Sequence, residues 1–257
     1  MIRLRETLSL KQLTAGQLEQ EQSEDTLIVD TRAAEQFASC HIEGALQIGL
    51  IGPFASWAAI LIKPTQKIIL IAEDRNRALE AQSRLARVGF NDVIGYAPAD
   101  EDQWRRVGIR LASLPIWRRD DVCLALQQGR PFQLVDVRSR AEWSQGHLPN
   151  AISIPLLELN SDAAPVDSSK PSLLYCQEGY RAMTAASILL RRTTGDIIVL
   201  IGSLDGCSLS WPPAATQEGP EQLEGMFIRV ASQEGLERAA ECTADPSASL
   251  GMTRGEG

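Results

Sequence analysis

The chain has 257 residues, a length more typical of two domains than of one. Hydrophobic residues make up 44% and charged residues 23%, which are ordinary values for a globular protein and argue against a disordered or collagen-like chain. The 25 basic and 33 acidic residues give a formal net charge of -8, so we do not expect a nucleic-acid binder, because phosphate binding requires clustered positive charge.

Five cysteines are scattered through the chain without a Cys-x-x-Cys pair, at positions 40, 123, 176, 207 and 242. An odd number at this low density favours neither a disulfide framework nor a structural zinc site. No signal peptide is evident at the N-terminus, and the most apolar stretch, 55–62, is much shorter than the roughly 20 residues of a membrane span. We therefore expect a cytoplasmic protein with free thiols and no membrane partner.

The predicted elements of the first half alternate between helix and strand. Helical periodicity predicts an opening helix over 11–22. The elements that follow are a strand, a loop, a helix and a strand, at 67–71, 72–77, 78–89 and 92–96. A proline near 112–118 marks the predicted boundary between the halves.

The second half repeats this order. It opens with a predicted helix over 118–128 and continues with a strand, a loop, a helix and a strand, at 172–175, 176–181, 182–192 and 196–202. Short, continuous apolar runs that alternate with helices ending near a glycine are typical of buried parallel strands in an α/β fold. From about residue 214 the chain is rich in Glu, Gly, Ala and Ser, and we expect a peripheral extension with a helix around 220–241.

An internal repeat relates the two halves. The segment LIVDTRAAEQFASCHIEGALQI aligns without gaps with the segment LVDVRSRAEWSQGHLPNAISIP. Matched residues are 106 positions apart and include Asp30 and Asp136, Arg32 and Arg138, Phe37 and Trp143, His41 and His147, and Ala45 and Ala151. The two histidines of the chain form one of these pairs, and chance repetition of this kind is improbable. The sequence therefore predicts a duplicated domain.

Cys176 stands where a predicted buried strand ends and a short loop leads into a helix. Ligands bind at this edge of open α/β sheets, and the amides of such a loop can form an anion-binding nest reinforced by the helix N-terminus. A cysteine in that place should exist largely as a thiolate. Arg181 adds a positive charge, and Gly179 suits a backbone with positive φ that turns the amides inward. Equally, a cysteine at a strand end can be a small buried apolar residue.

The motifs of both halves resemble those of the rhodanese, or sulfurtransferase, superfamily. The pattern is Asp-x-Arg, an acidic residue, an aromatic residue and Gly-His-Leu-Pro-Asn-Ala, and then a strand that ends in Cys-x-x-Gly-x-Arg. The second half carries it as VDVRSRAEWSQGHLPNAISIP and YCQEGYRA. In the first half, Cys40 and Glu43 replace the usual Gly and Pro, and Ala72 stands where the cysteine belongs.

The resemblance implies an α/β protein with two tandem rhodanese-like domains, each a mostly parallel sheet flanked by helices. It divides the chain into an inactive domain over 8–113, a catalytic domain over 116–214 and the peripheral extension over 215–257. It also implies that Cys176 takes sulfane sulfur from thiosulfate or a glutathione persulfide and passes it to cyanide or a thiol. Arg181 and the loop amides would hold the anionic persulfide. No metal or organic cofactor is expected, because the cysteine itself carries the sulfur.

Four residues form the expected substrate-binding loop between Cys176 and Arg181, namely Gln177, Glu178, Gly179 and Tyr180. Glu178 would repel a dianion, so we expect thiosulfate to be a poorer donor than a persulfide. Asp136 and Arg138 are expected to fix a neighbouring strand end through charge-assisted hydrogen bonds. A place near the substrate entrance is the alternative for Arg138.

Histidine titrates near neutrality, which makes His147 and its repeat partner His41 candidates for acid–base catalysis. The first half keeps its histidine without a nucleophile, however, so a structural hydrogen bond is the better interpretation for both. Cys207 lies in the segment that follows the last predicted strand and is an alternative candidate for a resolving thiol.

Two other function classes stay open. One is a non-catalytic module that senses persulfide or serves as a scaffold in sulfide oxidation. The other is a phosphatase related to the dual-specificity phosphatases of the cell-division cycle and to arsenate reductases, but those have five residues between cysteine and arginine, whereas this loop has four. Tandem rhodanese pairs also occur fused to persulfide dioxygenases, which makes such an enzyme a candidate partner.

Overall fold

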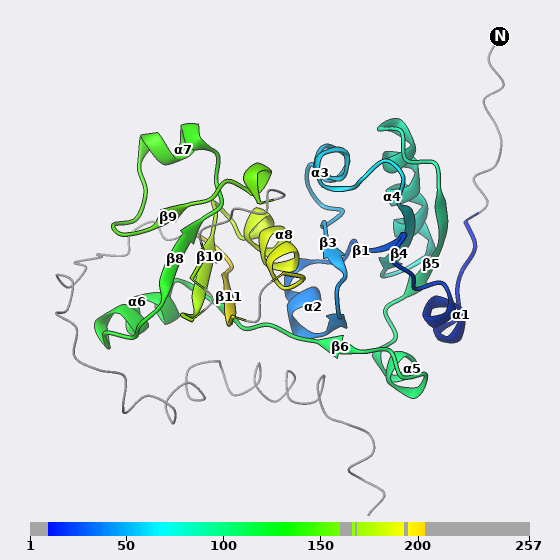
Figure 1. Ribbon diagram of the computed structural model, residues 1–257, viewed down its shortest axis with the longest axis horizontal. Coiled ribbons are helices and arrows are strands. Elements are labelled where there is room, and N and C mark those ends of the chain that lie inside the picture. Colours follow the sequence, from blue (N-terminus) through cyan, green and yellow to red (C-terminus); the bar gives the residue numbers. More distant parts are fainter. Residues whose placement is uncertain (1–9, 160–165, 168, 193–194, 204–257) are drawn as a thin grey trace, which may run out of the picture.

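The computed structural model describes residues 10–159, 166–167, 169–192 and 195–203. Within them the chain forms two parallel sheets, one from each half, with helices packed on them (Figure 1). We call residues 10–114 copy one and the described residues from 115 onward copy two. The predicted helix around 220–241 and the cysteines at 207 and 242 lie outside the described residues.

Copy one contains a parallel sheet of four strands in the order β3-β1-β4-β5. In chain order these are β1 (Thr26–Asp30), β3 (Leu46–Gln47), β4 (Lys67–Ala72) and β5 (Val93–Pro98). Its helices are α1 (Ala15–Gln20), α2 (Ala34–Ser39), α3 (Phe54–Leu61), α4 (Arg75–Arg87) and α5 (Glu101–Arg106). An antiparallel pair, β2 (His41–Ile42) with β6 (Leu111–Ala112), completes it.

Copy two contains a parallel sheet of five strands in the order β7-β11-β10-β8-β9. In chain order these are β7 (Ile116–Trp117), β8 (Gln133–Asp136), β9 (Ile152–Ser153), β10 (Ser172–Tyr175) and β11 (Ile197–Leu200). Its helices are α6 (Arg119–Gln127), α7 (Arg140–Gln145), the 3-10 turn η1 (Leu156–Glu158) and α8 (Tyr180–Leu189). A bridge from Gln12 to Tyr96 takes the place of β7 in copy one, so the two sheets share one topology and the predicted duplication is confirmed.

The central strands are apolar because both of their faces are covered. In β4 the residues from Ile68 to Ala72 are all fully buried, and in β10 Leu173 and Leu174 are. The helix that follows β4 buries alanines and a leucine spaced three and four residues apart, Ala78, Ala81 and Leu85. The predicted fold class, an α/β protein with two mostly parallel sheets flanked by helices, is confirmed. None of the described helices is both long and apolar enough to cross a bilayer.

Three predicted boundaries differ from the structure. The loop predicted over 72–77 ends at Asp74, whose carboxylate accepts the amide hydrogen of Arg77 at 2.9 Å and so starts α4 earlier. The loop predicted over 176–181 likewise ends at Gly179, and Tyr180 and Arg181 belong to the first turn of α8. The helix predicted over 11–22 has only six residues, because the Thr14 capping box begins it at Ala15.

Helix α8 lies between the two copies (Figure 1). It packs on β10 and β11 of copy two and on β3 and α2 of copy one. All residues from Ala182 to Leu189 are buried, including two hydroxyl groups that find partners in Gln47 of copy one. The backbone amide of Gln47 donates to Ser187 Oγ at 3.0 Å, and the Thr184 hydroxyl donates to the side-chain Oε1 of Gln47 at 3.3 Å. The helix that begins at the predicted catalytic loop is therefore part of a core shared by both copies.

Candidate active site

Cys176 follows the last residue of β10, at the carboxyl end of the central strand, and its residue is 6% exposed. The backbone amide of Gly179 donates a hydrogen bond to its Sγ at 3.1 Å. Gly179 has φ 104, which confirms the positive φ expected of it. A Cβ there would also lie 3.1 Å from Ile201 Cα and 3.2 Å from the Leu200 carbonyl oxygen. The glycine therefore lets the loop turn back over the sulfur while it passes close to β11.

Arg181 stands in the first turn of α8 and is held by a carboxylate. Its two terminal nitrogens donate to Glu142 of α7 at 2.6 and 2.7 Å. Pairing with Glu142 raises the pKa of Arg181, and a smaller contribution in the same direction comes from the nearby Cys176 side chain. The same bonds, together with those from Ser139, lower the pKa of Glu142 to about 2.

Glu142 is a site residue for which the sequence analysis gave no role. It occupies the acidic position of the Asp-x-Arg motif, and that position was the available signal. The pairing itself was not foreseeable, because Glu142 and Arg181 are 39 residues apart along the chain. The equivalent residue of copy one, 106 positions earlier, is Gln36, which cannot neutralise an arginine.

The loop leaves hydrogen-bond donors for an anion. The N-cap of α8 is Gly179, which makes no side-chain cap hydrogen bond within the described part of the chain. Amides in the first turn of a helix lack an intrahelical partner, and a negative charge there is stabilised by the helix dipole. Gln177 and Glu178 are exposed at the start of the loop. Chemically, the arrangement can hold a thiolate or a longer sulfur anion between backbone amides and a guanidinium.

Asp136, Arg138 and His147 tie together the segment from β8 to β9. The Arg138 guanidinium pairs with the Asp136 carboxylate at 2.6 Å and donates to the Gly146 carbonyl oxygen at 2.7 Å. His147 stacks on the Trp143 ring at 3.6 Å and bonds the Trp143 carbonyl oxygen through Nδ1 at 3.1 Å. These side-chain hydrogen bonds lie within the segment, and the Asp136 backbone pairs with Tyr175, the residue before Cys176.

Copy one has the same scaffold in a more buried form. Arg32 pairs with Asp30 at 2.6 Å and donates to the Cys40 carbonyl oxygen at 2.8 Å. His41 stacks on Phe37 at 3.8 Å, and burial lowers the pKa of His41 to about 4. At the end of β4, fully buried Ala72 takes the place of the cysteine.

The other cysteines correct one expectation. Cys176 is a free cysteine, whereas Cys40 and Cys123 are disulfide-bonded. The expectation that every thiol is free was therefore wrong, because the number and spacing of cysteines do not show which of them the fold brings together.

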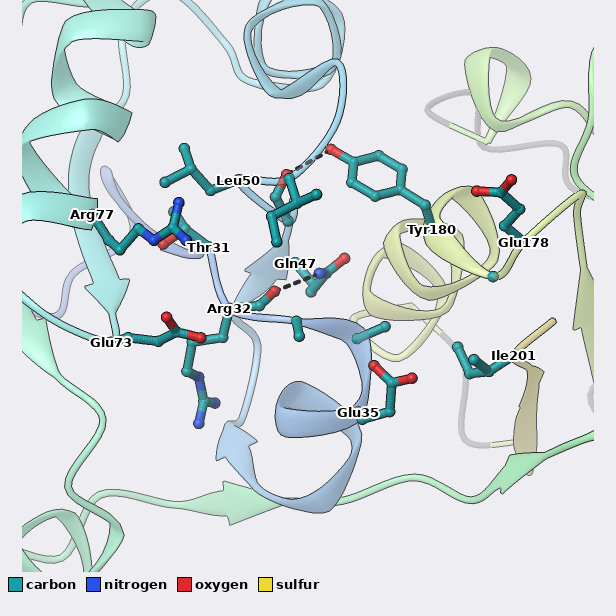
Figure 2. Close-up of a pocket in the computed structure, with 15 residues that line it drawn as sticks. Thr31, Arg32, Glu35, Gln47, Leu50, Glu73, Arg77, Glu178, Tyr180 and Ile201 are labelled. Atoms are coloured by element: carbon teal, nitrogen blue, oxygen red, sulfur yellow. Dashed lines mark hydrogen bonds between the residues drawn. The ribbon is translucent and has the colours of Figure 1, made fainter.

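A pocket of about 250 Å³ lies between the copies, next to the Cys176 loop (Figure 2). Copy one contributes Thr31 and Glu73, which follow strands, and Glu35 and Arg77 from the helices α2 and α4. Copy two contributes Glu178, Gly179, Tyr180 and Ile201. Figure 2 shows Tyr180 extending from α8 toward the backbone at Leu50. Cys176 is not among the lining residues. Three glutamates against two arginines, Arg32 and Arg77, leave the lining with a net negative charge, which disfavours an anion.

A central parallel strand that ends in a cysteine, with an amide and an arginine at the sulfur, is the arrangement expected of a rhodanese-type domain. The Rhodanese-like domain family matches residues 14–97 and 120–209, and the chain belongs to this family. Both copies are matched, in agreement with the tandem arrangement predicted from the repeat.

Known relatives match parts of the chain. A sulfurtransferase of Allochromatium vinosum is 27% identical over 86 residues, which cover 34% of this chain and 80% of that protein. An HTH-type transcriptional regulator of Mycobacterium tuberculosis is 33% identical over 78 residues, 30% of this chain and 33% of the regulator. The solved thiosulfate sulfurtransferase of Pseudomonas aeruginosa aligns with 91% of this chain and 47% of its own, at 18% identity and a TM-score of 0.35. The match thus spans only a third of the regulator.

Proposed function

We propose that the protein is a sulfurtransferase that moves sulfane sulfur through a persulfide on Cys176. The observation that carries the proposal is the placement of its Sγ at the end of the central strand, 3.1 Å from the Gly179 amide and beside Arg181. Membership of the rhodanese-like family supports the class of reaction. Copy one, with Ala72 in the place of the cysteine, would have no catalytic role of its own.

The reaction proceeds in two displacements. The Cys176 thiolate attacks the outer sulfur of the donor, the sulfur–sulfur bond of the donor breaks, and sulfite or a thiolate leaves with the bonding electrons. Cys176 then carries an anionic persulfide, which the Gly179 amide, the first-turn amides of α8 and Arg181 stabilise. A thiolate or cyanide attacks the terminal sulfur and releases the Cys176 thiolate. In this scheme Glu142 holds Arg181 in place, and Asp136, Arg138 and His147 support the neighbouring strand end.

Glu178 favours a persulfide over thiosulfate as the donor. Its side chain is exposed at the mouth of the loop, where a negative charge raises the energy of a bound dianion. A glutathione or protein persulfide carries less charge at the reacting sulfur. We therefore propose a persulfide donor, with thiosulfate as a poorer one, and cyanide or a thiol as the acceptor.

The test compares sulfur loading with discharge. The protein is incubated with thiosulfate or glutathione persulfide, its intact mass is measured, and cyanide is added. We expect a one-sulfur adduct that forms faster from the persulfide, is discharged by cyanide, and is absent from Cys176→Ser. An adduct that survives this substitution would show that the site is wrong, and faster loading from thiosulfate would contradict the donor preference.

A persulfide-sensing module without turnover is the second candidate. The burial of Cys176 favours it, since a thiol that is only 6% exposed is accessible to few acceptors. The same experiment separates the two candidates. An enzyme releases many equivalents of thiocyanate per protein chain, whereas a sensor loads one sulfur and releases it slowly.

The remaining proposals concern the setting of the reaction. We propose a cytoplasmic protein with an inactive domain over 8–113, a catalytic domain over 116–214 and an extension over 215–257. A persulfide dioxygenase or another enzyme of sulfide oxidation is the proposed partner, since such an enzyme handles the same sulfur species. Co-purification of a tagged chain with a dioxygenase from the same cells tests the partner, and its absence in cells that oxidise sulfide would contradict it.

A further inference from the structure

Tyr180 is the first residue of α8, directly after the Cys176 loop, and its side chain extends from copy two to contact copy one (Figure 2). Its hydroxyl donates to the Gly49 carbonyl oxygen at 2.8 Å. Burial raises the pKa of Tyr180, so the phenol stays protonated and remains a donor at neutral pH. The sequence analysis placed Tyr180 in the substrate-binding loop and did not foresee this contact.

The ring of Tyr180 rests on two glycines of copy one. A Cβ at Gly49 would lie 3.2 Å from the ring atom Cε2, and a Cβ at Gly52 would lie 3.1 Å from the same atom. Both distances are too short for an unstrained contact, and Gly52 also has φ 131. The segment between β3 and α3 thus leaves space for an aromatic ring from the other copy.

This segment is firmly held within copy one. The Ile48 amide donates to the Asp30 carbonyl oxygen at 3.0 Å, and the Leu50 amide donates to the Thr31 carbonyl oxygen at 2.9 Å. From α4, Arg84 donates to the Leu50 carbonyl oxygen at 2.8 Å. The acceptor of the Tyr180 hydroxyl is therefore flanked on both sides by hydrogen bonds to the sheet and helix of copy one.

Tyr180 also stands between the two residues that handle the sulfur. Gly179 precedes it and donates its amide to Cys176 Sγ, and Arg181 follows it and places its guanidinium beside the same sulfur. A displacement of the backbone at Tyr180 would move both the Gly179 amide and the Arg181 guanidinium. A side chain with two rotatable bonds, packed and hydrogen-bonded at its far end, limits such a shift.

We propose that Tyr180 is a positioning residue through which copy one holds the Cys176 loop in its reactive geometry. The inference rests on the proposed function for its purpose, because a reactive Cys176 serves sulfur transfer. It gives the copy without a nucleophile a task in catalysis: it supplies the fixed surface on which the loop is anchored.

The test measures the reactivity of Cys176 in Tyr180→Phe, which keeps the ring and removes the hydroxyl. Iodoacetamide alkylation of the Cys176 peptide is followed by mass spectrometry from pH 5 to pH 9, beside the rate of persulfide loading. We expect both rates to fall about three- to tenfold, the equivalent of one net hydrogen bond. Tyr180→Ala, which also removes the ring, should lower them further, and the pH profile of alkylation should shift.

Ser187→Ala is the matched control. It removes another hydrogen bond between α8 and copy one, that from the Gln47 amide, but lies two turns further along α8. We expect it to lower the thermal midpoint at least as much as Tyr180→Phe does and to leave Cys176 alkylation unchanged. Tyr96→Phe, which loses a hydrogen bond to Gln12 inside copy one, should behave in the same way.

Two results would overturn the proposal. One is wild-type alkylation and loading rates in Tyr180→Phe, and the other is an equal loss of reactivity in Ser187→Ala, which would indicate a general effect of the interface. Alkylation requires no sulfur donor, so the outcome is independent of the proposed function. If the wild-type protein transfers no sulfur from any donor, the proposed function fails. The alkylation rates still decide whether Tyr180 controls the reactivity of Cys176.

Discussion

The loops after β4 and β10 lie at the same place in the two copies. They differ in the group that accepts a hydrogen bond from the amides at the start of the next helix. In copy one, the Asp74 carboxylate accepts the Arg77 amide at 2.9 Å, so the chain supplies its own anion to α4. In copy two, the N-cap of α8 is Gly179, which has no side chain, and the neighbouring sulfur accepts its amide. A helix N-terminus can serve a substrate anion only where the chain has not already capped it.

The surrounding scaffold is the same in both copies. Each has an arginine paired with the aspartate two residues earlier and bonded to a carbonyl oxygen eight residues on. The final arginine of the loop is also present twice, as Arg77 and Arg181, but its partner differs. Arg181 is paired with Glu142 at 2.6 Å, whereas Arg77 contacts Glu80 on its own helix at 3.5 Å. The copies therefore differ in the residues of the loop and in the carboxylate that pairs with its arginine. The Asp–Arg pairs that support the neighbouring strand end are the same in both.

Restoring only the cysteine in copy one tests whether its loop is inactive for a second reason, namely the Asp74 cap and the missing carboxylate partner of its arginine. We expect the thiol introduced by Ala72→Cys, in a Cys176→Ser background, to be alkylated about a hundredfold more slowly than wild-type Cys176, because position 72 is fully buried, Asp74 already caps the following helix, and Arg77 is paired with Glu80 on its own helix. Peptide mass spectrometry after iodoacetamide measures the rate. Comparable alkylation of the two thiols would mean that Asp74 and the missing glutamate are unimportant.

Removing the carboxylate that holds Arg181 makes copy two more like copy one. We expect Glu142→Gln to lower persulfide loading about tenfold to thirtyfold, equivalent to about 1.5–2 kcal/mol, the lower part of the range for hydrogen bonds to a charged group, because the pair is partly exposed. Single-turnover loading measures this effect. Glu158→Gln, in the exposed pair with Arg140, is the control and should load at the wild-type rate. Equal losses in both variants would contradict a specific role for Glu142.

The same variant has a defined pH dependence of stability. The folded-state pKa of Glu142, about 2, is below its ordinary value of 4.5, so the ion pair stabilises the fold above pH 4.5 and this contribution is lost as the pH falls toward 2. Because the side chain is a third exposed, we expect about 1 kcal/mol at pH 7. Denaturant unfolding of wild type and Glu142→Gln should show this difference at pH 7 and a smaller one at pH 3. A constant difference would contradict the assigned pKa.

A last comparison concerns the glycine that copy two alone has at the N-cap. Gly179→Ala adds a Cβ at φ 104 and against Ile201 and Leu200, whereas Gly108→Ala adds one at φ 83 with nothing within 4 Å. Both variants should lose about 1–2 kcal/mol from the positive φ, and Gly179→Ala should lose about 1 kcal/mol more from crowding. Urea denaturation compares them. Equal losses would mean that the loop can move away from β11 without cost.

Much of the fold was predictable because its signals are local. The apolar runs at 67–71 and 172–175 mark the central strands closely, since buried parallel strands have no polar face. Helix starts were predicted less well. Asp74 begins α4 earlier than periodicity indicated, because a cap is set by one side chain and not by the pattern of the helix body.

The sequence by itself determined the duplication, the α/β class of each copy and the cysteine that ends a buried strand of copy two, because each depends on short motifs and on periodicity. Only the tertiary structure decided which residues hold the loop and the arginine around that cysteine. Glu142 reaches Arg181 across 39 positions, and Tyr180 reaches Gly49 across 131. Such contacts arise because α8 packs between the copies. Residues that are far apart in the sequence then lie within a few ångströms of one another, and no local sequence pattern shows which residues these are.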